Sequence, residues 1–534
     1  MIRYFQTDRF SGIGYLLCVP VSCLASVRFA LSTQPVIDSV LRMQVAEFPK
    51  IALGFAFWGM LDVCLLLVME MLRLRLLKHI NVALKEDLCG AALRESYQAY
   101  AAKNSDVLSV VTNDAKTVSD CYFASLLSLY RAIWSFFFSL FTAVCLSPAI
   151  TAVILLVGVV SVLVPRLLGK RIDRLQVKLS DQKETYSKLV QDMMEGLPTI
   201  KTMQAEQFFA QKHHLSNAKT EELECRVDVS LYFATWFSGL CSSAAYIATL
   251  LLGGALALQG RMTAGLVVGI SQLIGGVVAP LEQVPALLAR IRSVSSVCKK
   301  CRNLLDSRPA EPLSNDTGDQ LLCKDAAFHY PGTHNGIEDF TYAFEMGKKY
   351  LLAGASGCGK STLGQLLAGL YRCESGSIQY PGIAAGKNGV LCVSQKAHVF
   401  RDTLRNNVAL GEPYTDEEIL AALDQCQLTE FAANLPGGLD EVLQEQYSCS
   451  GGEAARLNLA RAVLRKPRIL VTDEITANLD APTSKRIDAM LASLHGVLLI
   501  TITHRISRDL AAQYDQILYL ENGRLVGSRT LHDR

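Results

Sequence analysis

Long apolar stretches dominate the first half of the chain. Six runs, each close to the roughly 20 residues that cross a bilayer as a helix, occupy residues 11–31, 51–72, 123–146, 149–168, 231–258 and 264–288. A single run of this kind is also compatible with a buried core helix, but six in succession predict an all-α membrane domain. The short polar and aromatic lead at residues 1–10 is expected to lie at the membrane interface.

The connections between these runs differ in length. Residues 146–148 and 259–263 predict tight turns, whereas the connections after the second and fourth runs are long and polar. Because basic residues mark cytoplasmic loops, both long connections are predicted to be cytoplasmic; the residues are Arg73, Arg75, Lys78, Arg166, Lys170, Arg171 and Arg174. Apolar residues recur at helical spacing through 182–210. We expect the spans to continue as helices past the bilayer, with short bends at their tips that touch the soluble domain.

The pattern changes after residue 305. Residues 306–320 (DSRPAEPLSNDTGDQ) hold prolines, small residues and acids without periodicity, which predicts a linker. From residue 321 to 534, short apolar strands alternate with helices, as in an α/β domain. The predicted organisation is a transmembrane domain at 1–305, a linker at 306–320 and a second domain at 321–534. An even number of spans places this second domain in the cytoplasm.

The stretch GASGCGKST, residues 354–362, fits the P-loop pattern. Apolar residues 350–353 precede it and a helix-compatible run follows, which is the strand–loop–helix context that the motif requires. Glycines let successive backbone N–H groups face a phosphate, and Lys360 and Ser361 suit the β- and γ-phosphates and a magnesium ion. The nucleotide-contacting residues are predicted to be Gly354, Ser356, Gly357, Cys358, Gly359, Lys360, Ser361 and Thr362. We also expect the thiol of Cys358 to be reachable from solvent and shielded by bound nucleotide.

A second acidic motif supports nucleotide hydrolysis. Residues 469–474 (ILVTDE) form an apolar strand that ends in Asp473 and Glu474. Asp473 is placed to bind magnesium through water, and Glu474 to position or activate the attacking water. The fold class is therefore a multidomain membrane protein, with a six-helix all-α transmembrane domain followed by an α/β P-loop ATPase domain.

Composition agrees with this division. The chain of 534 residues has 52 basic and 50 acidic residues, a net charge of +2, so nothing indicates a nucleic-acid partner. Mean hydropathy is +0.24, and the apolar excess lies in the first part of the chain. Many of the 16 cysteines lie in apolar runs, where cysteine acts as a small hydrophobic residue. We expect no disulfide framework and a reducing environment for the soluble part.

At this point the chain resembles a known family. CSGGE, residues 449–453, resembles the signature motif of ABC transporter nucleotide-binding domains. Tyr330 in FHYPG resembles the residue that stacks on adenine, and Gln395 in VSQKAHVF resembles the Q-loop glutamine. Residues 478–480 (NLD) resemble the D-loop, and His504 in ITITHR resembles the switch histidine. Residues 104–114 and 195–201 are similar to the intracellular regions of exporter-type (type IV) half-transporters, so the resemblance covers almost the whole chain.

The resemblance implies a dimer that sandwiches two ATP molecules and moves a substrate by alternating access. It implies catalysis by Glu474, His504 and Lys360, and magnesium held by Ser361, Gln395 and Asp473. It also implies contacts to ATP from Tyr330, Gln395, Ser450, Gly451, Gly452, Glu453 and Asp480. The expected function is export of a small molecule, lipid or peptide across the cell membrane. An importer of a metal chelate and an ATP-gated channel or regulator are the alternatives.

The signature departs from the usual LSGGQ at both ends. Cys449 and Glu453 replace its first and last residues, and the small Ala454 and Ala455 follow where polar residues are usual. The P-loop side is complete and the signature side is altered. This combination is compatible with a homodimer and with one half of a heterodimer that has unequal sites.

Two further features leave alternatives open. Charged residues interrupt the apolar runs at Arg28, Asp62, Glu70, Arg131 and Glu282. They are compatible with a polar cavity for a charged or amphipathic substrate, and equally with interhelical ion pairs or snorkelling side chains. Cys298 and Cys301 form a lone C-x-x-C, and since no further ligands lie nearby at suitable spacing, a metal or redox role is disfavoured.

Overall fold

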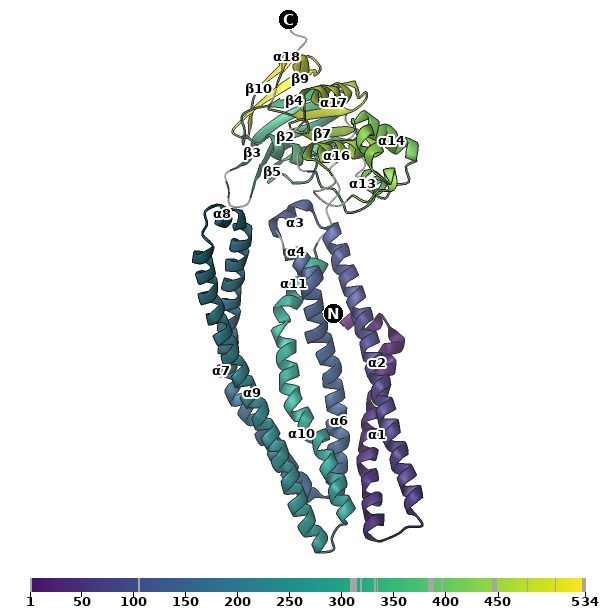
Figure 1. The fold of residues 1–534 in the computed structure, drawn as a ribbon. Helices are drawn as coiled ribbons and strands as arrows, with labels where there is room; N and C mark the ends of the chain where they lie inside the picture. Colours follow the sequence, from purple (N-terminus) through teal and green to yellow (C-terminus); the bar gives the residue numbers. More distant parts are fainter. Residues whose placement is uncertain are drawn as a thin grey trace. The chain divides into compact units, whose positions relative to one another are not determined.

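The computed structural model describes residues 2–103, 106–307, 315–316, 319–330, 333, 335–382, 389–394, 397–443, 449–477, 479–504 and 506–530. Its contacts divide the chain into two compact units (Figure 1). The first unit is Met1–Ala91 with Leu108–Asp306, and the second is Ala92–Val107 with Ser307–Arg534. The first unit is helical, whereas the second holds both β-sheets.

The first unit is built from long helices. They are η1 (Ile2–Gln6), α1 (Arg9–Leu41), α2 (Phe48–Arg94), α4 (Asp106–Ser109), η2 (Val110–Asp114), α5 (Ala115–Val118), η3 (Ser119–Phe123), α6 (Ala124–Leu146), α7 (Pro148–Glu195), α8 (Leu197–Thr202), α9 (Glu206–Leu258), α10 (Ala264–Ser293) and α11 (Ser295–Leu305). In the described part of the chain, five helices are long and apolar enough to cross a membrane: Arg9–Leu41, Phe48–Arg94, Val107–Leu146, Glu206–Leu258 and Ala264–Ser293. The remaining predicted span begins in α7, which is apolar over Pro148–Leu163. The predicted helical membrane domain is confirmed.

Helix α10 is the centre of this unit. It packs against α1, α6, α7 and α9, and its buried residues Ile270, Ile274 and Val277 share a core with Ile150 of α7. Because lipid tails are as apolar as these side chains, close backbone approach through small residues supplies much of the packing. A Cβ on Gly276 would lie only 2.1 Å from Ser139 Oγ of α6, so glycine sets this helix separation.

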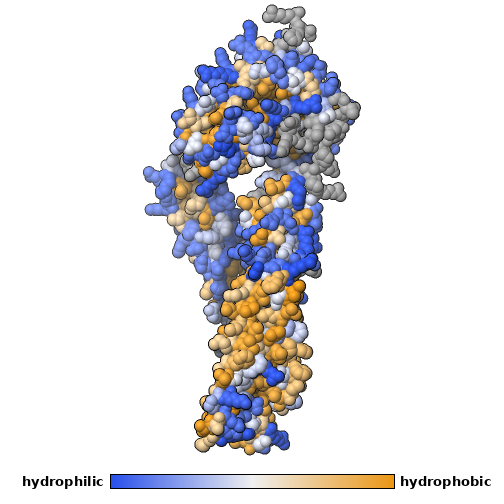
Figure 2. All heavy atoms as spheres, turned by 90° about the vertical axis from the view of Figure 1, so that its right-hand side faces the viewer, coloured by the Kyte–Doolittle hydropathy of each residue, from blue (hydrophilic) through white to orange (hydrophobic). Residues whose placement is uncertain are grey.

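The lipid-facing surface is continuous and apolar. Figure 2 shows a hydrophobic band over the helices of the first unit, on the side of α1 and α2. Exposed apolar side chains of α1 and α2 include Leu17, Val21, Leu53, Phe57 and Met60. An exposed apolar band of this kind is what a bilayer covers.

The predicted connections are also observed. Ser147 caps α7 and Thr263 caps α10, each accepting a backbone N–H within a tight turn. Helices α7 and α9 hold 48 and 53 residues, or about 70–80 Å at 1.5 Å per residue. This is more than twice the roughly 30 Å hydrocarbon core. The spans therefore continue as helices, as predicted, and α8 is a short bend between α7 and α9.

The second unit contains two sheets. The strands are β1 (Asn315–Asp316), β2 (Gln320–His329), β3 (Gly336–Glu345), β4 (Lys349–Ala353), β5 (Ser375–Pro381), β6 (Val390–Val393), β7 (Ile469–Asp473), β8 (Leu498–Ile502), β9 (Gln516–Glu521) and β10 (Arg524–Thr530). One sheet has the order β1-β5-β2-β3 and the other β10-β9-β4-β8-β7-β6. In the six-stranded sheet, β4, β6, β7, β8 and β9 are parallel, and β10 is antiparallel to β9. The helices are α3 (Tyr97–Lys103), α12 (Lys360–Leu367), α13 (Leu404–Ala409), α14 (Asp416–Gln425), α15 (Thr429–Asn434), η4 (Gly438–Asp440), α16 (Gly451–Arg465), α17 (Ala481–Ser493) and α18 (Arg508–Ala511).

Helix α3, from the first long connection, belongs to this second unit. The rings of Tyr97 and Tyr371 meet edge to face with centroids 5.5 Å apart. The Arg372 backbone N–H donates to Gln98 Oε1 at 3.1 Å. The expectation that a short bend at a helix tip touches the soluble domain is confirmed for this connection.

Candidate active site

The three central parallel strands bring the predicted motifs to one edge. The P-loop follows β4, Asp473 and Glu474 end β7, and His504 follows β8, which lies between those two strands. Carboxyl ends of parallel strands share one edge of a sheet, where α/β folds bind ligands. Motifs separated by more than a hundred residues therefore belong to one site.

The P-loop backbone requires glycine. Gly354, Gly357 and Gly359 have φ angles of 151°, 80° and 103°. A Cβ on Gly354 would lie 2.3 Å from the Leu520 carbonyl oxygen, so no side chain fits there. Lys360 begins α12 and is buried, and its Nζ donates to the carbonyl oxygens of Gly354 at 2.9 Å and Ala355 at 2.8 Å. The ammonium group is thus held against the loop, where a phosphate would compete for its hydrogen bonds.

The expectation for Cys358 is wrong. Its side chain is only 7% exposed and packs in the core with Phe328 and Ile337. A main-chain hydrogen bond fixes the P-loop at this residue: the Cys358 carbonyl accepts from the Gly523 N–H at 2.9 Å. Because the side chain is buried and its Sγ lies 3.8 Å from Lys360 Nζ within the P-loop, the thiol is not reachable from solvent in the folded domain.

Asp473 and Ser361 form an oxygen-rich site beside the P-loop. Burial raises the pKa of Asp473, and a hydrogen bond from Ser361 opposes this shift. Among the residues that the structure describes, Asp473 Oδ1 is buried without a hydrogen-bond partner. Magnesium prefers carboxylate, hydroxyl, phosphate and water oxygens, so this pair fits the predicted magnesium site.

Glu474 and His504 are in contact. Glu474 adopts a φ of 50°, which is uncommon for a residue with a side chain. Its backbone N–H donates to the Ile502 carbonyl at 3.0 Å, and its Oε1 lies 2.5 Å from His504 Nε2. The backbone of Glu474 is strained, and its carboxylate contacts a histidine at the edge of the sheet. This is the arrangement of a group that orients water.

Tyr330 lies next to the helix that follows the P-loop. Its hydroxyl donates to Gln365 Oε1 at 3.1 Å and accepts from Thr362 Oγ1 at 3.4 Å. Its ring meets those of Phe328 and Tyr371. Tyr371 in turn contacts Tyr97 of α3, so an aromatic chain joins the predicted adenine-stacking residue to α3.

The signature residues begin α16. Ser450 caps this helix in a reciprocal capping box with Glu453, whose Oε2 accepts from Ser450 N at 2.7 Å and Oγ at 2.8 Å. Gly451 and Gly452 form the first turn and carry no side chains, whereas the Glu453 carboxylate lies at the same positive end of the helix dipole. Cys449 packs against the core, and burial raises its pKa to about 11. Among the described residues, no hydrogen bond joins Ser450–Glu453 to the P-loop of the same chain.

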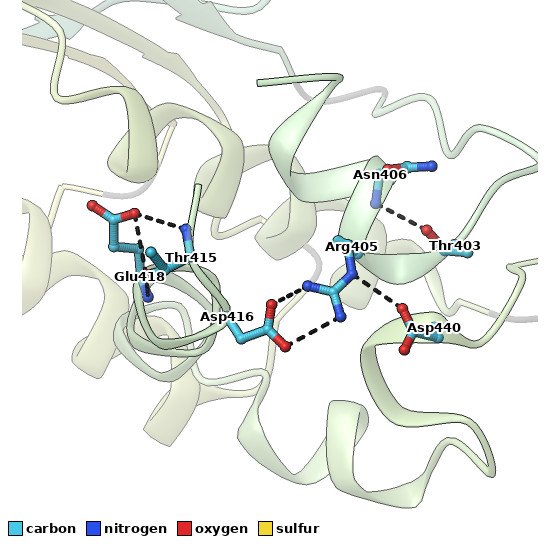
Figure 3. Close-up of polar contacts among 7 residues, drawn as sticks. All are labelled: Thr403, Arg405, Asn406, Thr415, Asp416, Glu418 and Asp440. Carbon is cyan, nitrogen blue, oxygen red and sulfur yellow. Dashed lines mark hydrogen bonds and ion pairs between the residues drawn. The ribbon is translucent and has the colours of Figure 1, made fainter. Parts of the chain in front are cut away.

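Two arginines, one buried in α16 and one bridging from α13, hold neighbouring elements together, and the sequence patterns did not reveal them. Arg461 of α16 donates to the carbonyl oxygens of Asn407 at 2.7 Å and His398 at 2.8 Å. Figure 3 shows Arg405 of α13 between Asp416 and Asp440, at 3.0 Å from Asp440 Oδ1. Both arginines therefore fix α13 relative to neighbouring elements.

The remaining predicted residues are less informative. Asp480 caps α17 by accepting from the Thr483 N–H at 3.1 Å, which lowers its pKa. Gln395 and Asn478 lie outside the described residues. Within those ranges, no group of three or more His, Cys, Asp or Glu side chains is arranged to hold a metal ion, and this includes Cys298 and Cys301.

A bundle of membrane helices joined to a P-loop ATPase domain of this kind defines an ATP-driven membrane transporter. The chain belongs to the ABC transporter family: residues 13–281 match the ABC transporter transmembrane region and residues 337–477 match the ABC transporter domain. It is a multi-pass membrane protein whose ATPase domain lies in the cytoplasm.

Individual relatives agree with this assignment. The chain is 25% identical over 437 residues to an ATP-dependent lipid A-core flippase of Photobacterium profundum, covering 79% of this chain and 74% of the relative. It is 27% identical over 442 residues to the Haemophilus influenzae protein of the same name, covering 78% and 74%. The structure of a bacterial Atm1-family ABC exporter with ATP bound shares the fold, with a TM-score of 0.80, 20% identity and coverage of 98% and 95%. These relatives favour the exporter over the importer and channel alternatives.

Proposed function

We propose that this chain is one half of a dimeric exporter. The dimer uses magnesium-dependent ATP hydrolysis to move an amphipathic substrate across the membrane, away from the cytoplasmic side. The observation that carries the proposal is the shared sheet edge of Lys360, Asp473, Glu474 and His504. The names of the flippase relatives support a lipid-like substrate.

Each residue has a distinct task in this proposal. Lys360 exchanges its bonds to the Gly354 and Ala355 carbonyls for the β- and γ-phosphates. Ser361 and the unpaired oxygen of Asp473 would hold magnesium, which would neutralise phosphate charge when bound. Glu474 orients the attacking water and accepts its proton, while His504 fixes the Glu474 carboxylate and reaches the γ-phosphate.

A second half-transporter completes the site. In the single chain, the signature turn at Ser450–Gly452 belongs to α16 and makes no bond to its own P-loop within the described residues. Its exposed N–H groups suit the phosphate of an ATP molecule bound to a partner. ATP then favours the closed pair of ATPase domains, and hydrolysis removes that bias.

In this proposal, closure of the two ATPase domains is transmitted to the membrane helices through α3. Tyr97 packs on Tyr371, which contacts Tyr330 beside the P-loop helix. A change at the nucleotide therefore reaches the first long connection through three aromatic rings.

The test is ATPase activity of the full chain, purified alone in lipid nanodiscs, with and without magnesium. Glu474→Gln should lower the rate by about 100-fold or more while ATP still binds. Glu430→Gln, an exposed residue of α15, is the matched control and should leave the rate unchanged. Equal activity of Glu474→Gln and wild type would refute the assignment.

The same measurement identifies the partner. Activity of the wild-type chain alone that is lost in Glu474→Gln means that a second copy supplies the signature. If the folded chain binds ATP but hydrolyses it only after an unlike half-transporter is added, the partner is that second chain.

A further inference from the structure

Two buried threonines interrupt the apolar strands that carry the catalytic edge. Strands β7 and β8 are otherwise almost wholly aliphatic and pack into cores on both faces of the sheet. Thr472 and Thr501 are 0% and 6% exposed and are register partners in the parallel ladder. Because a buried hydroxyl costs free energy unless it forms a hydrogen bond, the partners of these two side chains decide what they contribute.

The side chain of Thr501 accepts two hydrogen bonds. Thr472 Oγ1 donates to Thr501 Oγ1 at 3.1 Å, and the Tyr514 hydroxyl donates to the same atom at 2.9 Å. Burial raises the pKa of Tyr514, so its hydroxyl keeps the proton that it donates. A hydroxyl oxygen has two acceptor lone pairs, and both are used in Thr501.

The two donors lie beside two different parts of the catalytic site. Thr472 directly precedes Asp473 and Glu474 at the end of β7. Tyr514 is buried in the core and follows α18 along the chain. Its bond joins residues 13 positions apart, so it closes a loop of chain that contains His504. One threonine oxygen therefore ties both the acidic strand end and the segment after His504 to β8.

The contact between Glu474 and His504 depends on these strand ends. Glu474 Oε1 lies 2.5 Å from His504 Nε2. Because the two residues follow neighbouring parallel strands, their separation depends on how β7 and β8 are held against each other. A misplacement of about 1 Å in a catalytic site can cost about 100-fold in rate. A group that fixes these strand ends therefore affects the rate of hydrolysis without touching ATP.

We propose that Thr501 is a positioning residue for ATP hydrolysis, which holds the end of β7 and the segment after β8 so that Glu474 meets His504. It acts through these two side chains, because its own hydroxyl is engaged inside the core. Without this hydroxyl, two buried donors lose their acceptor, and the strand ends shift as the donors find other partners. The inference rests on the proposed function, since it concerns the rate of the same hydrolysis reaction.

The experiment measures kcat and KM for ATP with the full chain in lipid nanodiscs, under the conditions in which the wild-type chain hydrolyses ATP. Thr501→Val keeps the shape of the side chain but removes the acceptor. It should lower kcat by about tenfold or more and leave KM within about twofold of wild type. Thr501→Ser keeps the hydroxyl and should recover most of the rate. An unchanged kcat in Thr501→Val, or a loss that Thr501→Ser does not recover, would overturn the proposal.

A second variant tests the same network if Thr501→Val fails to fold. Tyr514→Phe removes one donor with little change in volume and should lower kcat by about two- to tenfold. Tyr380→Phe is the matched control: Tyr380 is also buried in the ATPase domain, and its hydroxyl donates to the Leu366 and Leu367 carbonyls at 3.3 and 3.2 Å. Both variants lose a buried donor, but only Tyr514→Phe should lower kcat. Equal effects of the two on kcat would contradict the positioning role.

A double variant separates positioning from a general loss of stability. In the His504→Ala background, Thr501→Val should lower the remaining rate by less than about twofold, because the contact that it positions is already lost. An equal loss in both backgrounds would show a merely structural role and would overturn the proposal. Glu474→Gln is assayed beside these variants. If it retains wild-type activity, the proposed function fails, whereas a loss in Glu474→Gln with unchanged activity in Thr501→Val refutes the positioning role alone.

Discussion

Arg461 is the residue whose replacement should most disturb the ATPase domain outside the catalytic groups. It is 8% exposed, donates to the Asn407 and His398 carbonyls, and donates to Asn407 Oδ1 at 3.1 Å. Its guanidinium also lies 5.4 Å from the ring centre of Phe400. Burial lowers the pKa of Arg461 to about 10, which is still well above neutral pH, so the group stays charged. The perturbation that we consider is Arg461→Met.

The magnitude follows from the bonds that are lost. Methionine fills a similar volume but leaves the Asn407 and His398 carbonyls without the arginine donors, whereas Asn407 Oδ1 keeps its bond from the Phe400 N–H at 2.9 Å. Each charge-assisted bond contributes about 1.5–3 kcal/mol, and the cation–π contact about 1–2 kcal/mol. The sum is an upper limit, because neighbouring terms are not additive and the desolvation cost of the buried charge is removed as well. We expect a net loss of about 3–5 kcal/mol, because each of the two carbonyls left without its donor costs about 1–3 kcal/mol and the cation–π contact is lost as well.

The assay is pulse proteolysis of the full chain in nanodiscs over a urea series, followed through the intact ATPase domain. With a slope of about 2–3 kcal/mol per molar urea, the midpoint should fall by about 1–2.5 M. Arg524→Met is the control, since Arg524 forms a surface ion pair with Glu338 at 2.9 Å and its side chain is 59% exposed. That control should cost at most about 1 kcal/mol. Equal midpoints for the two variants would refute the reasoning.

Three further predictions concern the site. Gly354→Ala should abolish ATP binding in an equilibrium assay, because its Cβ would lie 2.3 Å from the Leu520 carbonyl. Gly527→Ala is the control and should still bind, because no atom lies within 4 Å of its Cβ. Tyr97→Ala should leave basal ATP hydrolysis largely intact but reduce the stimulation of ATPase activity by substrate, because the ring contact with Tyr371 contributes about 0.5–1.5 kcal/mol. Unchanged stimulation would argue against coupling through the aromatic chain. Because burial raises the pKa of Asp473, apparent magnesium affinity should decline on acidification at a higher pH than for an ordinary aspartate. Titrating ATPase activity with magnesium from neutral to mildly acid pH tests this, and an apparent magnesium affinity that stays constant over this range would contradict it.

The fold class and the catalytic motifs could be predicted because their physical causes are local. A bilayer-spanning helix requires about 20 apolar residues in succession, and the six runs met that condition without further information. The glycines and Lys360 of the P-loop act through the conformation of a few consecutive residues, so their spacing alone indicated a phosphate site. The acidic end of the strand at 469–474 could be predicted for the same reason, since an apolar run followed by two acids is a local pattern.

Other features depended on contacts between distant residues. Gln98 and the Arg372 backbone meet across 274 residues, and Arg461 meets Asn407 across 54. The thiol of Cys358 was expected to be reachable, but it is buried beside Lys360 within the P-loop. Of the intramembrane charges, Asp62 and Glu70 proved to have partners, whereas Arg131 lines a cavity.

The sequence by itself thus determined that this protein spans a membrane and carries a P-loop ATPase, since bilayer thickness and phosphate geometry impose fixed local patterns. Only the tertiary structure decided which polar groups are paired and which thiols are buried. Pairing and burial depend on which helices and strands pack together, and packing is set by shape complementarity over the whole chain rather than by any single stretch of it.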